Sequence, residues 1–130
     1  MILNNQKTII VCVYRSPDGN LNMFVEKFID ILEGICCDNV NVIICGDFNV
    51  NFMVKDFNSM YVNNVFSSFG LVGHVQGFTR VSAFSSTLID NIFTNFEGDQ
   101  INCSVIETDL SDHYAQELWI DCTPKPVSYT

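Results

Sequence analysis

The sequence alternates between short apolar runs and polar segments rich in turn-forming residues. Residues 7–14 (KTIIVCVY) and 39–46 (NVNVIICG) are rich in β-branched residues and have strand length, so they predict two buried strands. Between them, apolar residues recur at helical spacing with charged residues mostly opposite, which predicts an amphipathic helix. A strand, a helix and a strand in this order indicate parallel neighbours in an α/β layer. The apolar positions of the helix are Leu21, Phe24, Val25, Phe28, Leu32 and Ile35.

The rest of the chain predicts a second helix and more short strands. Turn-forming residues fill positions 15–20, where Asp18 or Asn20 could cap the first helix. The second helix, at residues 59–69, has a weaker pattern and is expected to end at Gly70. The tail at residues 123–130 holds two prolines and is interpreted as a linker or a frayed end. Strands are expected at residues 71–75, 88–93, 102–106 and 117–121.

Composition agrees with one packed unit at residues 1–122. The chain has 130 residues, of which 48% are hydrophobic, so it is long enough for one core and too apolar to be disordered. Charged residues make up only 16%, below the roughly 25% typical of soluble domains. A surface with so few charges is expected to include an apolar region that a partner covers.

Charge and cysteine usage exclude several classes of protein. Fifteen acidic and six basic residues give a net charge of -9, which argues against a surface that alone grips nucleic-acid phosphates. Six cysteines occur without a Cys-x-x-Cys pair, and three of them lie inside apolar runs, so we expect reduced thiols and neither disulfides nor structural zinc. No signal peptide and no apolar run of about 18 residues is present, which favours an intracellular location, the nucleus included, without a membrane span.

Polar clusters follow or interrupt the predicted strands. Taken alone, the Gly46-Asp47 and Ser111-Asp112 pairs are explained by a turn or a helix cap, whereas Asp90 is harder to explain in this way. Ligand sites in open α/β sheets gather at the carboxyl ends of strands, so together the clusters are expected to converge. They are Tyr14-Arg15-Ser16-Pro17, Gly46-Asp47-Phe48-Asn49, Asp90 within an apolar strand, and Ser111-Asp112-His113.

Two of these clusters predict specific chemistry. Asp90 is flanked by apolar residues, so burying its carboxylate requires a donor, and His113 is the obvious candidate. In extended geometry Asp47 and Asn49 project to the same side while Phe48 turns to the core. One carboxylate and one amide oxygen facing a shared cavity suit Mg²⁺ or Mn²⁺ better than zinc.

These motifs resemble the endonuclease/exonuclease/phosphatase superfamily. The wording is most similar to the endonuclease domains that accompany reverse transcriptases in non-LTR retrotransposons: IICGDFNVNF, GFTRVSAFSSTLIDNIFTN and SDH. Four motifs in family order over nearly the whole chain carry the resemblance. It implies an α/β (α+β) sandwich with a mixed sheet and flanking helices, of which this chain is the incomplete C-terminal half.

The resemblance also implies a role for each motif. Metal-assisted phosphodiester hydrolysis of DNA would use Mg²⁺ or Mn²⁺ held by Asp112 with Asp47 and Asn49. Asp47 would also activate the attacking water, and Tyr14 would bind the phosphate. His113 would bind the scissile phosphate while Asp90 orients it. Substrate or supporting contacts would come from Thr79, Arg80 and Ser111.

The chain departs from the family at its N-terminal side. The family supplies a metal-ligand glutamate from an N-terminal half, and no strand here carries a matching glutamate, so we expect that half to be missing and the chain alone to be inactive. Two other hypotheses remain: a non-catalytic retroelement fragment that serves at most as a binding module, and a small-molecule phosphatase of the same superfamily. The retroelement-like wording around Asp90 counts against the phosphatase.

Overall fold

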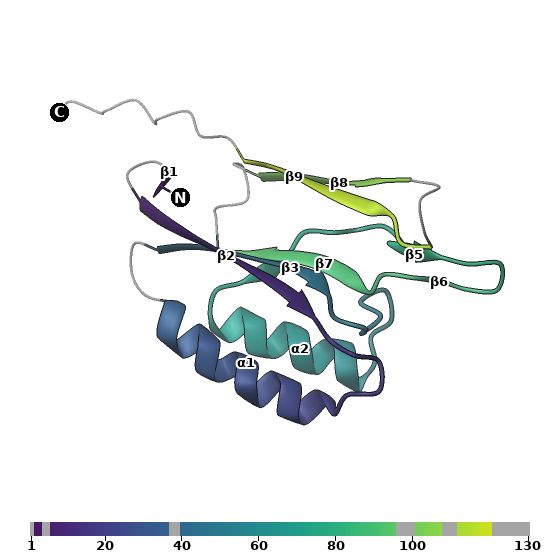
Figure 1. The fold of residues 1–130 in the computed structure, drawn as a ribbon, viewed down its shortest axis with the longest axis horizontal. Coiled ribbons are helices and arrows are strands. Elements are labelled where there is room, and N and C mark those ends of the chain that lie inside the picture. Colours follow the sequence, from purple (N-terminus) through teal and green to yellow (C-terminus); the bar gives the residue numbers. More distant parts are fainter. Residues whose placement is uncertain (1, 4–5, 37–39, 96–100, 108–111, 121–130) are drawn as a thin grey trace.

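The computed structural model describes residues 2–3, 6–36, 40–95, 101–107 and 112–120. A mixed sheet lies between two helices on one face and a β-hairpin on the other (Figure 1). The sheet has the order β1-β2-β3-β7-β4, with β1 at Ile2–Leu3, β2 at Gln6–Tyr14, β3 at Val40–Asp47, β7 at Asp90–Thr94 and β4 at Val72–Gly73. The other elements are α1 (Leu21–Ile35), α2 (Phe57–Ser68), β5 (Arg80–Val81), β6 (Ser86–Thr87), β8 (Ile101–Ile106) and β9 (Ala115–Ile120).

The central strands pair as the order of elements predicts. Strands β2 and β3 are parallel and are joined through α1, which confirms the predicted strand–helix–strand unit. Strand β7 then pairs with β3 in the antiparallel direction, and β4 pairs with β7 in the same way. The antiparallel neighbour makes the sheet mixed, and it brings the first residue of β7 beside the last residue of β3.

Both predicted helices form, and local capping explains where they begin and end. The side chain of Asn20 accepts a hydrogen bond from the backbone of Met23, which identifies Asn20 as the cap of α1. Helix α2 begins two residues earlier than expected because Asp56 and Ser59 form a reciprocal capping box. It ends before Gly70, whose φ of +76° is the left-handed conformation that glycine adopts most readily.

Both helices cover one face of the sheet with an aromatic core. The rings of Phe66 and Phe93 meet edge to face with centroids 4.6 Å apart, and Phe48 contacts both. Ile44 contributes from β3 and is completely buried. Burial of apolar side chains is the main favourable term in folding, so the core between the helices and the sheet contributes much of the free energy of unfolding.

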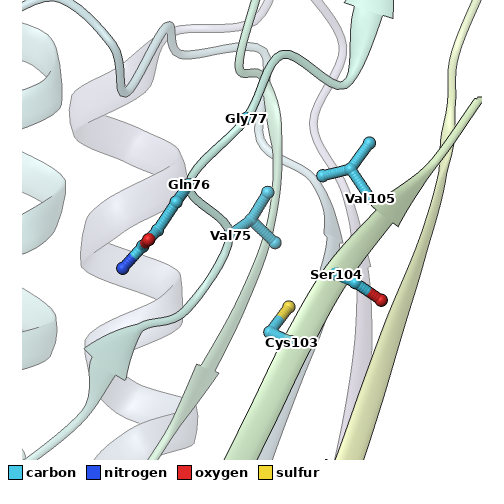
Figure 2. Close-up of a pocket in the computed structure, with 6 residues that line it drawn as sticks. All are labelled: Val75, Gln76, Gly77, Cys103, Ser104 and Val105. Atoms are coloured by element: carbon cyan, nitrogen blue, oxygen red, sulfur yellow. The ribbon is translucent and has the colours of Figure 1, made fainter.

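The opposite face packs against the β8–β9 hairpin through a smaller apolar cluster. Ile43 and Ile92 extend from the sheet toward apolar residues of the hairpin. A small pocket of about 180 Å³ remains beside β8, where Figure 2 shows Val75, Cys103 and Val105 facing one another. The hairpin packs on β3 and β7, whereas on β2 the side chain of Ile10 is 51% exposed.

The structure differs from the predicted elements at the sheet edge. The strand expected at residues 71–75 is reduced to β4, because Leu71 packs into the helix-side core while Val75 packs toward the hairpin. The short β5–β6 hairpin was not predicted, since its residues lack apolar alternation. The tail at residues 123–130 lies outside the described residues. Within the described part of the chain, no helix has the length and apolar character needed to cross a bilayer.

Candidate functional site

The register of three neighbouring strands aligns three candidate residues. Tyr14 at the end of β2 pairs with Asp47 at the end of β3, and Asp47 pairs with Asp90 at the start of β7. Residues directly opposite one another point to the same face of a sheet, here the hairpin face. Glycine is required at position 46, because a Cβ there would meet the carbonyl oxygen of Val13 at 1.9 Å. Strands β2 and β3 therefore approach closely at Gly46, and the next pair in register, Tyr14 and Asp47, lies side by side where the two strands end.

His113 reaches this row from the segment that precedes β9. The backbone N–H of Val81 donates to the carbonyl of Asp112 at 2.8 Å, and the N–H of Tyr114 donates to the carbonyl of Thr79. Arg80 and His113 form an isolated antiparallel bridge between these two bonds. The start of β5 thus places the His113 ring against the ends of β3 and β7.

Asp47, Asp90 and His113 form a compact cluster. Nδ1 of His113 lies 2.8 Å from Oδ2 of Asp90, and Nε2 lies 3.9 Å from Oδ2 of Asp47. The expected donor for the buried Asp90 is therefore present at hydrogen-bonding distance. A carboxylate bonded to one ring nitrogen fixes the orientation of the imidazole and directs the other nitrogen into the site. One ligand atom from each residue lies within 4.8 Å of the others, a spacing that can hold a metal ion.

The charges of this cluster suit a cation. Burial raises the pKa of Asp47 above its ordinary value, and the Asp90 carboxylate across the ladder raises it further. The backbone N–H of Asn49, with His113 and Arg80, acts in the opposite direction. Two carboxylates in one partly buried site are stabilised by a proton or by a bound cation. Oxygen-rich donor sets of this kind fit divalent metals, so the residues present fit a metal site.

Asp112 lies at the exposed rim of the site, where its carboxylate bonds to Arg80. The distance from Nε of Arg80 to Oδ2 of Asp112 is 2.8 Å, and nearly half of each side chain is exposed. The hydrogen bond from Arg80 lowers the pKa of Asp112. The structure groups His113 and Asp90 with Asp47, whereas the Asp112 carboxylate pairs with the guanidinium of Arg80.

The remaining candidates occupy different depths. Tyr14 is 71% exposed beside Asp47 and is accessible to a substrate. Thr79 is fully buried, and its hydroxyl accepts hydrogen bonds from the backbone of Ile89 and Asp90, so it supports Asp90 from behind the site. Ser111 lies outside the described residues.

The expected extended geometry from Asp47 to Asn49 is wrong. Phe48 does turn into the core, but β3 ends at Asp47 and Asn49 has a φ of 50°, in the left-handed region. The side-chain amide nitrogen of Asn49 donates to the carbonyl of Arg15. A turn that needs its own hydrogen bonds has replaced the alternation of a strand, and the role of Asn49 toward a metal stays a prediction.

Arg15 is the residue whose role the sequence did not reveal. Its guanidinium is buried and donates to the carbonyls of Phe48 (2.7 Å), Asn49 (2.8 Å) and Gly19 (3.0 Å). These bonds satisfy carbonyls that the turn after Asp47 leaves without strand partners. A lone arginine directly after a predicted strand, in a chain with six basic residues, was the only available signal.

Comparisons with known proteins identify the fold. No protein-family model and no curated protein matches the sequence. The endonuclease domain of TRAS1, a telomere-specific non-LTR retrotransposon, is similar with a TM-score of 0.69 and 18% identity, over 84% of this chain and 54% of that one. An endonuclease/exonuclease/phosphatase family protein from Leptotrichia buccalis has a TM-score of 0.62 and 19% identity, over 89% of this chain and 48% of that one. The chain therefore spans about half the length of the structures it matches, and the expected fold class is confirmed.

Proposed function

From the endonuclease/exonuclease/phosphatase fold of this chain, we propose that it carries the catalytic half of a divalent-metal-dependent phosphodiesterase. The proposed enzyme is a DNA endonuclease of the kind found in non-LTR retrotransposons. The observation that carries the proposal is the Asp47–Asp90–His113 cluster at the strand ends. A carboxylate-oriented histidine beside a second carboxylate can supply the proton transfer and the charge stabilisation that hydrolysis of a phosphate ester uses.

We assign each residue of the site a separate role in this hydrolysis. Asp90 holds the ring of His113 so that Nε2 faces the substrate, and in its protonated form that nitrogen donates to the scissile phosphate. Asp47 orients the attacking water, and the exposed hydroxyl of Tyr14 donates to the same phosphate. Asp47 would hold Mg²⁺ or Mn²⁺, with Asn49 and Asp112 as the further ligands that the resemblance implies, and the ion would supply Lewis-acid stabilisation of the phosphate oxygens. Arg15 keeps the turn after Asp47 in place.

We also propose that this chain needs a complementing segment to be active. The resemblance assigns a glutamate ligand to the part of the domain that this chain does not span. Glu26 and Glu33 lie on α1, which packs on the face opposite the cluster, and Glu117 belongs to β9. None of the glutamates in the described ranges is grouped with the cluster. Changing a residue that only supports a metal ligand already costs roughly 10–100-fold in metal affinity or activity, so losing a ligand itself should cost more.

The β5–β6 hairpin favours a nucleic acid over a small phosphate ester as substrate. Figure 1 shows this hairpin extending away from the helices, and Phe84 between its strands is 99% exposed. The hairpin begins at Arg80, whose backbone bridges His113 in the site. An exposed aromatic ring at the end of a hairpin can stack on a base or enter a groove, whereas a small substrate would not reach it.

Plasmid nicking tests the proposal. With Mg²⁺ we expect no cleavage of supercoiled plasmid by the chain alone, and nicking when an N-terminal half from a similar endonuclease domain is supplied in trans. His113→Ala should abolish that nicking, and Asp30→Asn, exposed on α1 on the opposite side of the sheet, should not. Nicking that survives His113→Ala would contradict the assigned site.

Substrate choice separates the remaining hypotheses. Hydrolysis of p-nitrophenyl phosphate, a monoester, in preference to plasmid would favour a phosphatase. Phe84→Ala should weaken plasmid nicking and leave hydrolysis of the diester bis(p-nitrophenyl) phosphate unchanged. Absence of any Mn²⁺ binding, and of any hydrolysis in the complemented complex, would favour a non-catalytic fragment.

A further inference from the structure

Two cysteines face each other across the parallel strands that lead into the site. Cys12 on β2 pairs directly with Cys45 on β3 in the sheet register. Their Sγ atoms are 3.9 Å apart, in van der Waals contact. Neighbouring strands are about 4.8 Å apart, which falls within the range of Cα separations that a disulfide can span. The backbone therefore already has the spacing that a bond between these thiols needs.

The pair is accessible because the face of β2 toward the hairpin is uncovered from Ile10 to Tyr14. Cys12 is exposed, as are Ile10 and Tyr14 on either side of it along the strand. Cys45 is half-buried and packs toward the β8–β9 hairpin. One thiol of the pair is thus open to solvent while the other lies beneath the hairpin.

We propose that Cys12 and Cys45 form a redox-active dithiol that a small-molecule disulfide, such as oxidised glutathione, converts to an intramolecular disulfide. The Cys12 thiolate attacks one sulfur of the small disulfide, whose S–S bond breaks and releases one thiol. The Cys45 thiolate then attacks the Cys12 sulfur, forms the Cys12–Cys45 bond and releases the second thiol. Two protein thiols are oxidised, and one small-molecule disulfide is reduced to two thiols.

The environment of the two thiols determines the order of these steps. Cys45 is half-buried beneath the β8–β9 hairpin, whereas the Cys12 sulfur is exposed to solvent and to a small disulfide. Cys12 is the accessible sulfur and reacts first. In the second step Cys45 is already in contact with its target, and an intramolecular reaction of this kind has a high effective concentration. The solvent-exposed bond that results is of the kind that is readily reduced again.

The proposal does not depend on the function assigned to the site, although the pair precedes Tyr14 and Asp47 by two residues on their respective strands. Cys103 provides a matched control. It is a half-buried thiol on β8 beside the small pocket (Figure 2). Its environment resembles that of Cys45, but its register partner on β9 is Leu118 rather than a cysteine.

Intact-mass and peptide mass spectrometry of the whole chain test the proposal. The chain is first fully reduced and then incubated with oxidised glutathione. We expect the loss of two hydrogens, the loss of two maleimide-reactive thiols, and a linkage between residues 12 and 45 that dithiothreitol reverses. Cys103→Ser should form the same bridge. Circular dichroism of each serine variant checks that it is folded.

The single variants separate the two steps. Cys45→Ser should retain one glutathione as a mixed disulfide on Cys12, because no second thiol resolves it. Cys12→Ser should form neither the bridge nor an adduct at Cys45. Oxidation that leaves residues 12 and 45 unlinked in the parent chain would overturn the proposal. Glutathione adducts on Cys45 in Cys12→Ser, at the rate of the parent reaction, would overturn the proposed order.

Discussion

The two faces of the central sheet are built from alternate residues of the same strands, yet they differ in what covers them. On one face α1 and α2 bury Ile44, Phe48 and Phe93 almost completely. On the other face the β8–β9 hairpin covers β3 and β7, while Ile10 and Tyr14 on β2 are exposed. All three residues of the Asp47–Asp90–His113 cluster belong to this second face. The helix face therefore supplies most of the buried core, whereas the hairpin face holds the candidate site and stays open to solvent along β2.

Adjacent isoleucines on β3 test this comparison most directly. Ile44 points to the helices and is fully buried, while Ile43 points to the hairpin and is 6% exposed. Ile44→Ala should lower the free energy of unfolding by about 3–5 kcal/mol, because the packed aromatic core cannot collapse into the cavity. Ile43→Ala should cost about 2–3 kcal/mol, because a hairpin attached at one side can relax toward the gap. Urea denaturation measures both values.

The two substitutions remove the same atoms from neighbouring positions, so they control for each other. Equal losses would mean that the hairpin packs as firmly as the helices. A larger loss for Ile43→Ala would reverse the assignment of the two faces.

Two arginines beside the site allow the stability of a buried set of hydrogen bonds to be compared with that of an exposed ion pair. Arg15→Leu should cost about 2–3 kcal/mol, since three carbonyl acceptors lose a charged donor and two of them belong to the turn after Asp47. Arg80→Leu should leave the unfolding midpoint unchanged, because its ion pair with Asp112 is exposed. Urea denaturation again measures the stability.

Arg15→Lys makes this prediction specific to the hydrogen bonds. A lysine keeps the charge but cannot donate from a planar fork to several carbonyls, so it should recover only part of the loss. A full recovery would show that charge alone matters at this position.

Two aspartates should shift stability in opposite directions with pH, and these are the smallest effects. Folding raises the pKa of Asp47 above 3.8. The contribution of Asp47 to the free energy of unfolding is therefore complete below pH 3.8, and it is lost as the pH rises through the pKa of the folded chain. Asp47→Asn should therefore raise Tm at pH 7 and leave it unchanged at pH 3.

The pKa of Asp112 is lowered, so Asp112 contributes to the free energy of unfolding above pH 3.8, and this contribution is lost at lower pH. Asp112→Asn should slightly lower Tm at pH 7.

Calorimetry at the two pH values measures these shifts, and the sign matters more than the size. A fall of Tm in Asp47→Asn at pH 7 would mean that His113 stabilises the Asp47 carboxylate more than burial and Asp90 oppose it.

Most of the secondary structure followed from local patterns. The β-branched runs became β2 and β3, and the helical spacing of apolar residues became α1 over the expected range. Errors occurred where local pattern and tertiary packing disagree. The strand expected at residues 71–75 retains only two residues, because Leu71 and Val75 pack toward opposite faces. The β5–β6 hairpin is held largely by its position beside residues 112–114, which no local pattern reveals.

The candidate site was partly predictable for the same reason. Asp90 lies in an apolar strand, and a buried carboxylate needs a hydrogen-bond donor, so His113 was the expected partner. The structure places Nδ1 of His113 at 2.8 Å from Oδ2 of Asp90. Asn49 could not be placed, because the turn after Asp47 depends on the guanidinium of Arg15, more than thirty residues away. A hydrogen bond between distant segments has no periodicity in sequence.

Hydrophobic period and strand-end position are local properties, so the sequence predicted most of the elements, the parallel β2–β3 pair, and the polar residues at the strand ends. Strand pairing in the folded chain places Asp47 opposite Asp90 across an antiparallel ladder and Cys12 in contact with Cys45 across a parallel one. The tertiary structure also decided that one face of the sheet is covered by helices and the other only in part. The physical reason is register: which residues of two strands lie opposite depends on contacts between segments distant in sequence, and a shift of one residue would send each side chain to the other face.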